Sequence, residues 1–94
     1  MELVYEIVGE ENYEYYPLGK YVVAAPKVCG GRPTFKYTRL EVKIILDLMA
    51  SGWTVEKILS EYNQSHLKPE AIREALHLAG NALLKIGTAE KLVA

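Results

Sequence analysis

The residues with the most chemical potential in this chain are two histidines and one cysteine. His66 and His77 are eleven positions apart, so they lack the i, i+4 spacing that places two metal ligands on one helix face. Cys29 is the only cysteine, which excludes an internal disulfide and a zinc site built from cysteines. We therefore expect no catalytic residue, no metal, no cofactor and no small-molecule substrate, and we predict that the chain is not an enzyme.

A run of basic residues is the strongest electrostatic feature, because residues 27–40 contain no acidic residue. Such a stretch can contact nucleic-acid phosphates, or arginines in it can pair with the carboxylates of a protein partner. A third interpretation is structural, with Arg39 paired inside the chain and the lysines simply solvated. The predicted partner- or phosphate-binding residues are Arg32, Lys36, Arg39 and Lys43.

Length and composition restrict the protein class. The 94 residues suffice for one small domain, and half of them are apolar. Eleven basic against twelve acidic residues give a net charge of −1, which excludes a strongly cationic nucleic-acid binder. The N-terminus is acidic where a signal peptide is basic, and no apolar run approaches the roughly 20 residues that span a bilayer. We expect a cytoplasmic protein without membrane contact.

The chain changes character near residue 38. Before it, residues 3–8, 13–16 and 20–24 are rich in β-forming residues between turns, which predicts an antiparallel ribbon. Tyrosines in this ribbon are expected to pair across strands. After residue 38, helical apolar spacing predicts helices near 39–51, 54–62 and 69–86. The predicted single α+β domain, 1–94, comprises a ribbon at 1–27, a Gly/Pro turn segment at 28–37, a three-helix core at 38–87 and a tail at 88–94.

Helix boundaries follow from capping residues. Thr38 and Glu41 have the spacing of a capping box, Thr54 is a predicted N-cap, and Pro69 suits the first position of a helix. The third helix is expected to bury one stripe of residues: Ile72, Ala75, Leu76, Ala79 and Leu83.

The first helix is apolar around much of its circumference. Ile44 and Leu48 extend its arc beyond one face, and such a wide arc indicates a central helix or an interface. Because the chain also has an apolar surplus, we predict a homodimer with Ile44 and Leu48 at the interface.

Three segments resemble the domain-of-unknown-function family 433. Residues 28–42 contain a Gly-Arg-Pro sequence and then Thr-Arg before a helix that starts near Val42, and residues 50–62 and 67–76 resemble that family's next two helices. The resemblance covers about residues 21–80. Tyr37 stands where the family usually has Gly, so a left-handed backbone there would be strained. Lys68 replaces the family's Thr or Ser and is a poor N-cap.

The resemblance implies a homeodomain-like helix-turn-helix fold and a likeness to VapB-type antitoxins, whose partners are PIN-type ribonucleases. It predicts an antitoxin-like regulator that binds such a nuclease, with binding of operator DNA left open. The third helix would be the recognition helix, with Arg73, His77 and Asn81 facing outward beside Glu70 and Glu74. The alternative is a stand-alone protein-interaction module, which dimerises and has no nucleic-acid role.

Overall fold

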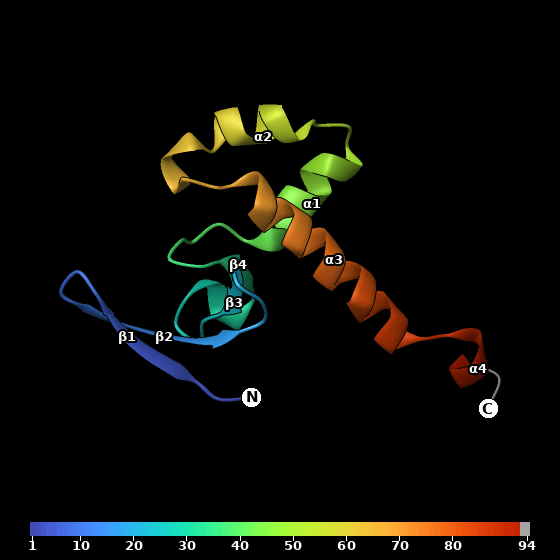
Figure 1. The fold of residues 1–94 in the computed structure, drawn as a ribbon, viewed down its shortest axis with the longest axis horizontal. Coiled ribbons are helices and arrows are strands. Elements are labelled where there is room, and N and C mark those ends of the chain that lie inside the picture. The colour runs from blue at the N-terminus through green and yellow to red at the C-terminus, as the bar shows by residue number, and fades with distance from the viewer. Residues whose placement is uncertain (93–94) are drawn as a thin grey trace.

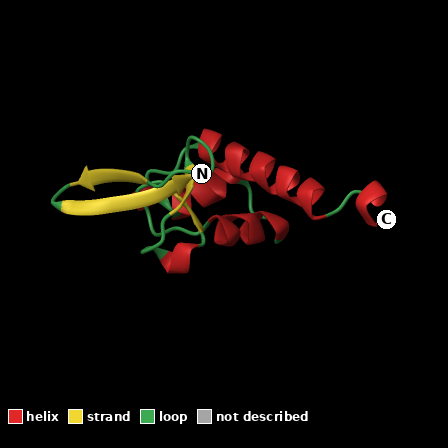
Figure 2. Cartoon of the chain, turned by 90° about the horizontal axis from the view of Figure 1, so that it is seen from below, coloured by secondary structure: helices red, strands yellow, loops and turns green. Residues whose placement is uncertain are grey.

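The fold is α+β, with an antiparallel sheet followed by helices (Figure 1), as predicted. A computed structural model describes residues 1–92. The described part is elongated, with extents of 51 × 34 × 20 Å. The β1–β2 hairpin projects at one end and the last helices at the other, as Figure 2 also shows.

Four strands form a meander in the order β1-β2-β3-β4, with β1 at Val4–Val8, β2 at Glu11–Pro17, β3 at Val22–Ala24 and β4 at Pro33–Phe35. Val8 pairs with Glu11, so a two-residue loop closes the hairpin, and Gly9 supplies the positive φ that the loop requires. β4 was not predicted. Its three residues lie in the segment expected to be irregular, and only pairing with β3 defines them as a strand.

The helices are α1 at Val42–Ala50, α2 at Val55–Glu61 and α3 at Pro69–Ile86. Two of the predicted helix starts are confirmed. Thr54 accepts a hydrogen bond from the Lys57 amide as the N-cap of α2, and Pro69 occupies the first turn of α3. The residue before it, Lys68, makes no side-chain cap. A short α4, Ala89–Leu92, begins the predicted tail, whose last two residues lie outside the described part.

The predicted capping box is wrong, and α1 starts three residues later than expected. The Thr38 hydroxyl accepts from the Leu40 amide and donates to the Phe35 carbonyl, which closes a turn rather than a helix end. Glu41 is the N-cap residue of α1 but makes no side-chain cap. Its carboxylate instead accepts from Arg32. The Thr-x-x-Glu spacing is therefore present without its usual function.

The turn before α1 has a left-handed residue at Tyr37, with φ +67°. Glycine adopts this conformation freely, whereas tyrosine is strained in it. The left-handed backbone that the resemblance raised for Tyr37 is therefore present. Tyr37 compensates through side-chain contacts. Its hydroxyl donates to Glu6, and its ring lies 5.3 Å from that of Tyr13.

The sheet separates two apolar clusters, because successive residues of β3 point to opposite faces. Val22 packs with the helices around Ile45, Ile58 and Ile72, which are fully buried. Val23 packs on the other face with Tyr15. The larger cluster therefore joins the sheet to the three helices, and the smaller one holds the β1–β2 hairpin.

Glu74 connects α3 to the sheet, although the sequence suggested that it faces solvent. Its carboxylate accepts hydrogen bonds from the amides of Lys20, Tyr21 and Val22 at 2.8–2.9 Å. Gly19 makes this approach possible, because a Cβ there would lie 2.4 Å from a Glu74 oxygen. The expected outward position of Glu74 is wrong because local helical spacing could not reveal a partner fifty residues earlier.

The second half of α3 extends beyond the core (Figure 1). Of the predicted buried stripe, Ile72 and Ala75 are buried, but Leu76 is 44% and Leu83 is 67% exposed, and Ala79 is exposed as well. The stripe continues along the helix past the point where α1 and the sheet end. Among the described residues, no helix is long and apolar enough to cross a bilayer.

Candidate partner-binding surface

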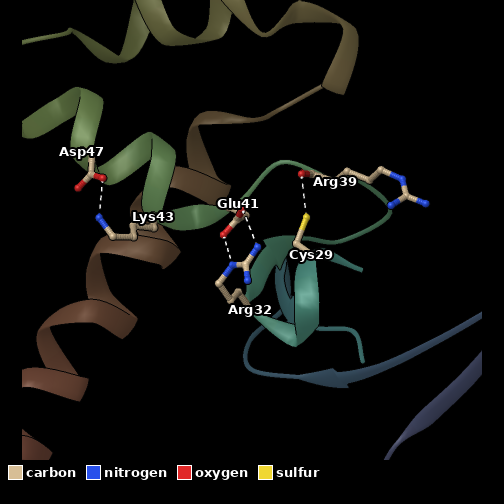
Figure 3. A network of polar contacts seen from close by, with 6 residues as sticks. All are labelled: Cys29, Arg32, Arg39, Glu41, Lys43 and Asp47. Atoms are coloured by element: carbon tan, nitrogen blue, oxygen red, sulfur yellow. Dashed lines mark hydrogen bonds and ion pairs between the residues drawn. The ribbon is translucent and has the colours of Figure 1, made fainter. Parts of the chain in front are cut away.

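The four predicted contact residues do not form one cationic patch. Figure 3 shows Arg32 turned toward Glu41, Lys43 turned toward Asp47, and Arg39 pointing away from both pairs. Lys36 lies elsewhere, against the β1–β2 hairpin. The continuous basic run of the sequence is therefore divided by the turn that precedes α1.

Two of these cations are neutralised by local carboxylates. Arg32 binds Glu41 through two nitrogens, at 2.7 and 3.4 Å. This hydrogen-bonded pair raises the pKa of Arg32 and lowers that of Glu41. On α1, Lys43 lies 2.7 Å from Asp47 one turn later, and that hydrogen bond raises the pKa of Lys43. Both pairs are exposed, so water screens them and a partner's charges can replace them.

Lys36 is held in a cluster of tyrosines. Its ammonium lies 4.9 Å from the Tyr15 ring centre, 5.0 Å from that of Tyr37 and 3.9 Å from a Glu6 oxygen. The contact with Tyr15 is the main cause of its raised pKa. Glu6 accepts hydrogen bonds from the hydroxyls of Tyr15 and Tyr37, which lower the pKa of its carboxyl. Lys36 thus clamps the hairpin to β4, which is a structural use.

Arg39 differs from the other three residues. Its side chain is exposed and, among the described side chains, it forms no ion pair. Its backbone is fixed, because the Cys29 thiol donates to the Arg39 carbonyl at 3.3 Å. The structural interpretation, in which Arg39 pairs inside the chain, is therefore wrong, and this guanidinium remains available to a partner.

An apolar groove runs between α1 and the second half of α3, with a cavity volume of about 580 Å³. Its apolar lining consists mainly of Leu18, Val22, Val42, Leu46, Ala75, Leu78, Ala79 and Ala82. The Arg32–Glu41 and Lys43–Asp47 pairs lie on its rim, and Lys85 also lines it. Two of the predicted contact residues therefore border an apolar groove rather than a phosphate-sized basic patch. Such a border suits a protein segment better than a nucleic-acid backbone.

The predicted recognition residues lie on the exposed face of α3. Arg73 pairs with Glu70 at 3.2 Å, and Asn81 contacts the His77 ring at 3.3 Å. Because Glu74 turns toward the sheet, this face carries less negative charge than the sequence suggested. The base-reading role of Arg73, His77 and Asn81 stays a prediction.

The predicted dimer residues on α1 have different environments. Ile44 is 42% exposed, whereas Leu48 is half-buried and packs against the main core. Ile44 is therefore the better interface residue of the two. More exposed apolar surface lies on α3, where Leu84 is 61% and Ile86 is 80% exposed. Leu84 and Ile86 flank the predicted apolar stripe of α3. Helical spacing alone could not show that the main core ends before these two residues.

The two histidines and the cysteine do not belong to a shared metal-binding group in the described part of the chain. His66 is exposed in a left-handed turn, and His77 is exposed on α3. Within residues 1–92, no group of three or more His, Cys, Asp or Glu side chains is placed to hold a metal ion.

Comparison with protein families identifies a match over residues 22–79, which is more than half of the chain, to the family described as "Protein of unknown function (DUF433)". The chain belongs to this family. The DUF433 match begins at β3 and ends within α3, so it includes α1 and the first part of α3, but excludes the β1–β2 hairpin and the groove residues Leu18, Ala82 and Lys85. Comparisons with curated proteins and with solved structures give no match.

Proposed function

We propose that this DUF433 protein is an antitoxin-like regulator that binds a PIN-type nuclease through the groove between α1 and α3. The observation that carries the proposal is the exposed apolar surface formed by the groove and the second half of α3. A monomeric soluble protein rarely leaves such a continuous apolar surface uncovered. An amphipathic segment of a partner fits a groove of this kind through apolar anchors.

Arg39 supplies a second, separate contact, because its side chain points away from the two ion pairs that line the groove (Figure 3). It stands in a backbone-anchored turn without an internal ion-pair partner in the described structure. An arginine in such a position can form two parallel hydrogen bonds with a carboxylate. The acidic metal site of a PIN-type nuclease, which the family resemblance implies as the partner, has that chemistry.

The test starts from the neighbouring reading frame, and the absence of a PIN-type nuclease there would count against the proposal. A nuclease encoded there is purified with this protein, with affinity measured by calorimetry and inhibition by ribonuclease assay. Ala82→Glu places a carboxylate in the groove from an exposed helical position. We expect it to weaken binding by about 1.4 kcal/mol or more, which is tenfold. Asn81→Glu is the matched control, because it adds the same charge one residue away, on the exposed face of α3 that carries Arg73 and His77 rather than in the groove. Equal weakening by both variants would refute groove binding.

Substitutions of Arg39 and Arg73 distinguish nuclease binding through Arg39 from binding through the outer face of α3. We expect Arg39→Ala to weaken inhibition of the nuclease and Arg73→Ala to leave it unchanged. Loss of binding with Arg73→Ala alone would mean that α3's outer face is the contact surface. Binding of operator DNA by Arg73, His77 and Asn81 is tested separately, by anisotropy with the gene's upstream DNA at several salt concentrations.

The alternative function, a dimerisation module, is supported by the exposure of Ile44. Ile44→Glu should convert a dimer into a monomer in light scattering if α1 forms the interface. If Ala82→Glu produces that conversion instead, a second copy of the chain occupies the groove. In that case the nuclease and the second copy compete for one surface.

A further inference from the structure

A second cavity, distinct from the apolar groove, opens between the turn that precedes α1 and the turn between α2 and α3. Its volume is about 350 Å³. Residues from three separate segments line it: Lys20 and Tyr21, Phe35 to Thr38, and Ser65 to Lys68 with Ala71. Of the predicted contact residues, only Lys36 lines this cavity.

The charge of this lining is one-sided. Three lysines and His66 line the cavity, and no acidic residue does. Lys20 and Lys68 are exposed and form no ion pair among the described side chains, in contrast to the paired Lys27, Arg32 and Lys43. Two lysines without a carboxylate partner among the described side chains therefore line the same small space, and the Lys20 ammonium lies 5.2 Å from the Tyr21 ring centre.

Two carboxylates that contact residues of the cavity lining already have other partners. Glu74 approaches Lys20 through the backbone, and its oxygens accept three amide hydrogen bonds. Glu6 binds the hydroxyls of Tyr15 and Tyr37 beside the ammonium of Lys36. Glu74 therefore serves the backbone amides and Glu6 lies beside Lys36. Neither carboxylate forms an ion pair with Lys20 or Lys68.

The rest of the lining suits a flat organic group beside an anion. Tyr21, Phe35, Leu67 and Ala71 provide an apolar side, and the hydroxyl of Ser65 adds a hydrogen-bonding group. Flexible lysines bind phosphate as point charges, and aromatic side chains accept bases by stacking. Glu70 in the first turn of α3 offsets the positive end of the helix dipole there, so the lysines supply the positive charge of the cavity.

We propose that this cavity binds a phosphate group carried by a nucleotide, either free or in a nucleic-acid strand, with Lys20 and Lys68 as the charge contacts. The site is separate from the proposed protein-binding groove, so either proposal can fail without the other. A nucleic acid bound here would approach the α2–α3 turn and the start of α3 rather than the middle of its outer face.

The probe for the test is AMP, titrated into the full chain labelled with ¹⁵N, with amide chemical shifts as the readout. We expect saturable shifts centred on residues 36–38 and 65–68. In the double variant Lys20→Gln/Lys68→Gln the affinity should fall about tenfold or more. The control, Lys27→Gln/Lys57→Gln, changes the net charge equally at positions that line neither this cavity nor the groove and should stay within about twofold. Circular dichroism checks that both double variants fold.

A second arm distinguishes the source of the phosphate. A short DNA duplex that shifts the same amides at lower concentration than AMP identifies a nucleic-acid backbone site, whereas shifts with AMP alone identify a free nucleotide. The proposal is overturned if neither probe shifts the cavity amides, or if the control double variant loses as much affinity as the cavity double variant.

Discussion

Replacing Glu74 by Ala should destabilise the whole domain, because this one carboxylate joins α3 to the sheet. The substitution removes the acceptor of three amide hydrogen bonds. The Lys20 amide is exposed and can bond to water, but the amides of Tyr21 and Val22 are partly buried. An unsatisfied buried donor costs about 1–3 kcal/mol. Two such donors give an expected loss of about 2–6 kcal/mol.

That loss is large for a domain of this size. Total stabilities of small domains are about 5–15 kcal/mol, and each kcal/mol corresponds to about 4–8 °C in melting temperature for this length. The assay is urea unfolding followed by the fluorescence of Trp53, the only tryptophan, with circular dichroism as a second probe. Coincident transitions would show that unfolding is two-state.

Two comparisons make the reasoning refutable. Glu70→Ala, one turn earlier on α3, removes the exposed pair with Arg73 and an acidic charge in the first turn of the helix, and should cost no more than about 1 kcal/mol. Gly19→Ala should cost about as much as Glu74→Ala, because its Cβ would displace the carboxylate, and the two losses should not add. A loss below about 1 kcal/mol for Glu74→Ala, or additive losses in the double variant, would contradict the assigned clamp.

The remaining predictions concern three other sites. Thr34→Val should raise stability by about 1 kcal/mol in urea unfolding, because the Thr34 hydroxyl is buried and has no hydrogen-bond partner among the described residues; a loss would contradict this. Tyr15 and Tyr37 lower the folded-state pKa of Glu6 below 4.5, so its contribution exists above pH 4.5 and disappears as pH falls through the lowered pKa. Wild type should therefore melt above Glu6→Gln at pH 7, and the difference should vanish in acid; a pH-independent difference would refute the linkage. Arg39→Ala should leave the thermal melting curve unchanged, and a clear drop would reveal a structural role.

The sequence was most informative where a local interaction determines the structure. Thr54 caps α2 through an amide three residues away, and Pro69 needs only its own ring to start α3. The family model, which matches residues 22–79, agrees with the resemblance found from short motifs. Local chemistry therefore located the second and third helices within a residue or so.

Prediction failed where a distant partner decides between two uses of a residue. Glu41 has the right spacing for a capping box with Thr38, but Arg32 binds it more favourably. Glu74 has helical spacing that suggests solvent, yet amides from residues 20–22 hold it. The groove and the phosphate cavity could not be predicted for the same reason, because segments far apart in the chain form each of them.

The projecting part of α3 has a consequence for the lifetime of the protein in the cell. Residues 79–86 are exposed throughout, and a helical segment without tertiary packing is marginally stable in water. This segment therefore unfolds locally before the rest of the domain, and a protease that requires an extended substrate cuts it first. A partner seated on the helix would protect it, so the free chain would be degraded faster than the bound chain. Faster degradation of the free chain would then lower the proportion of free to bound protein.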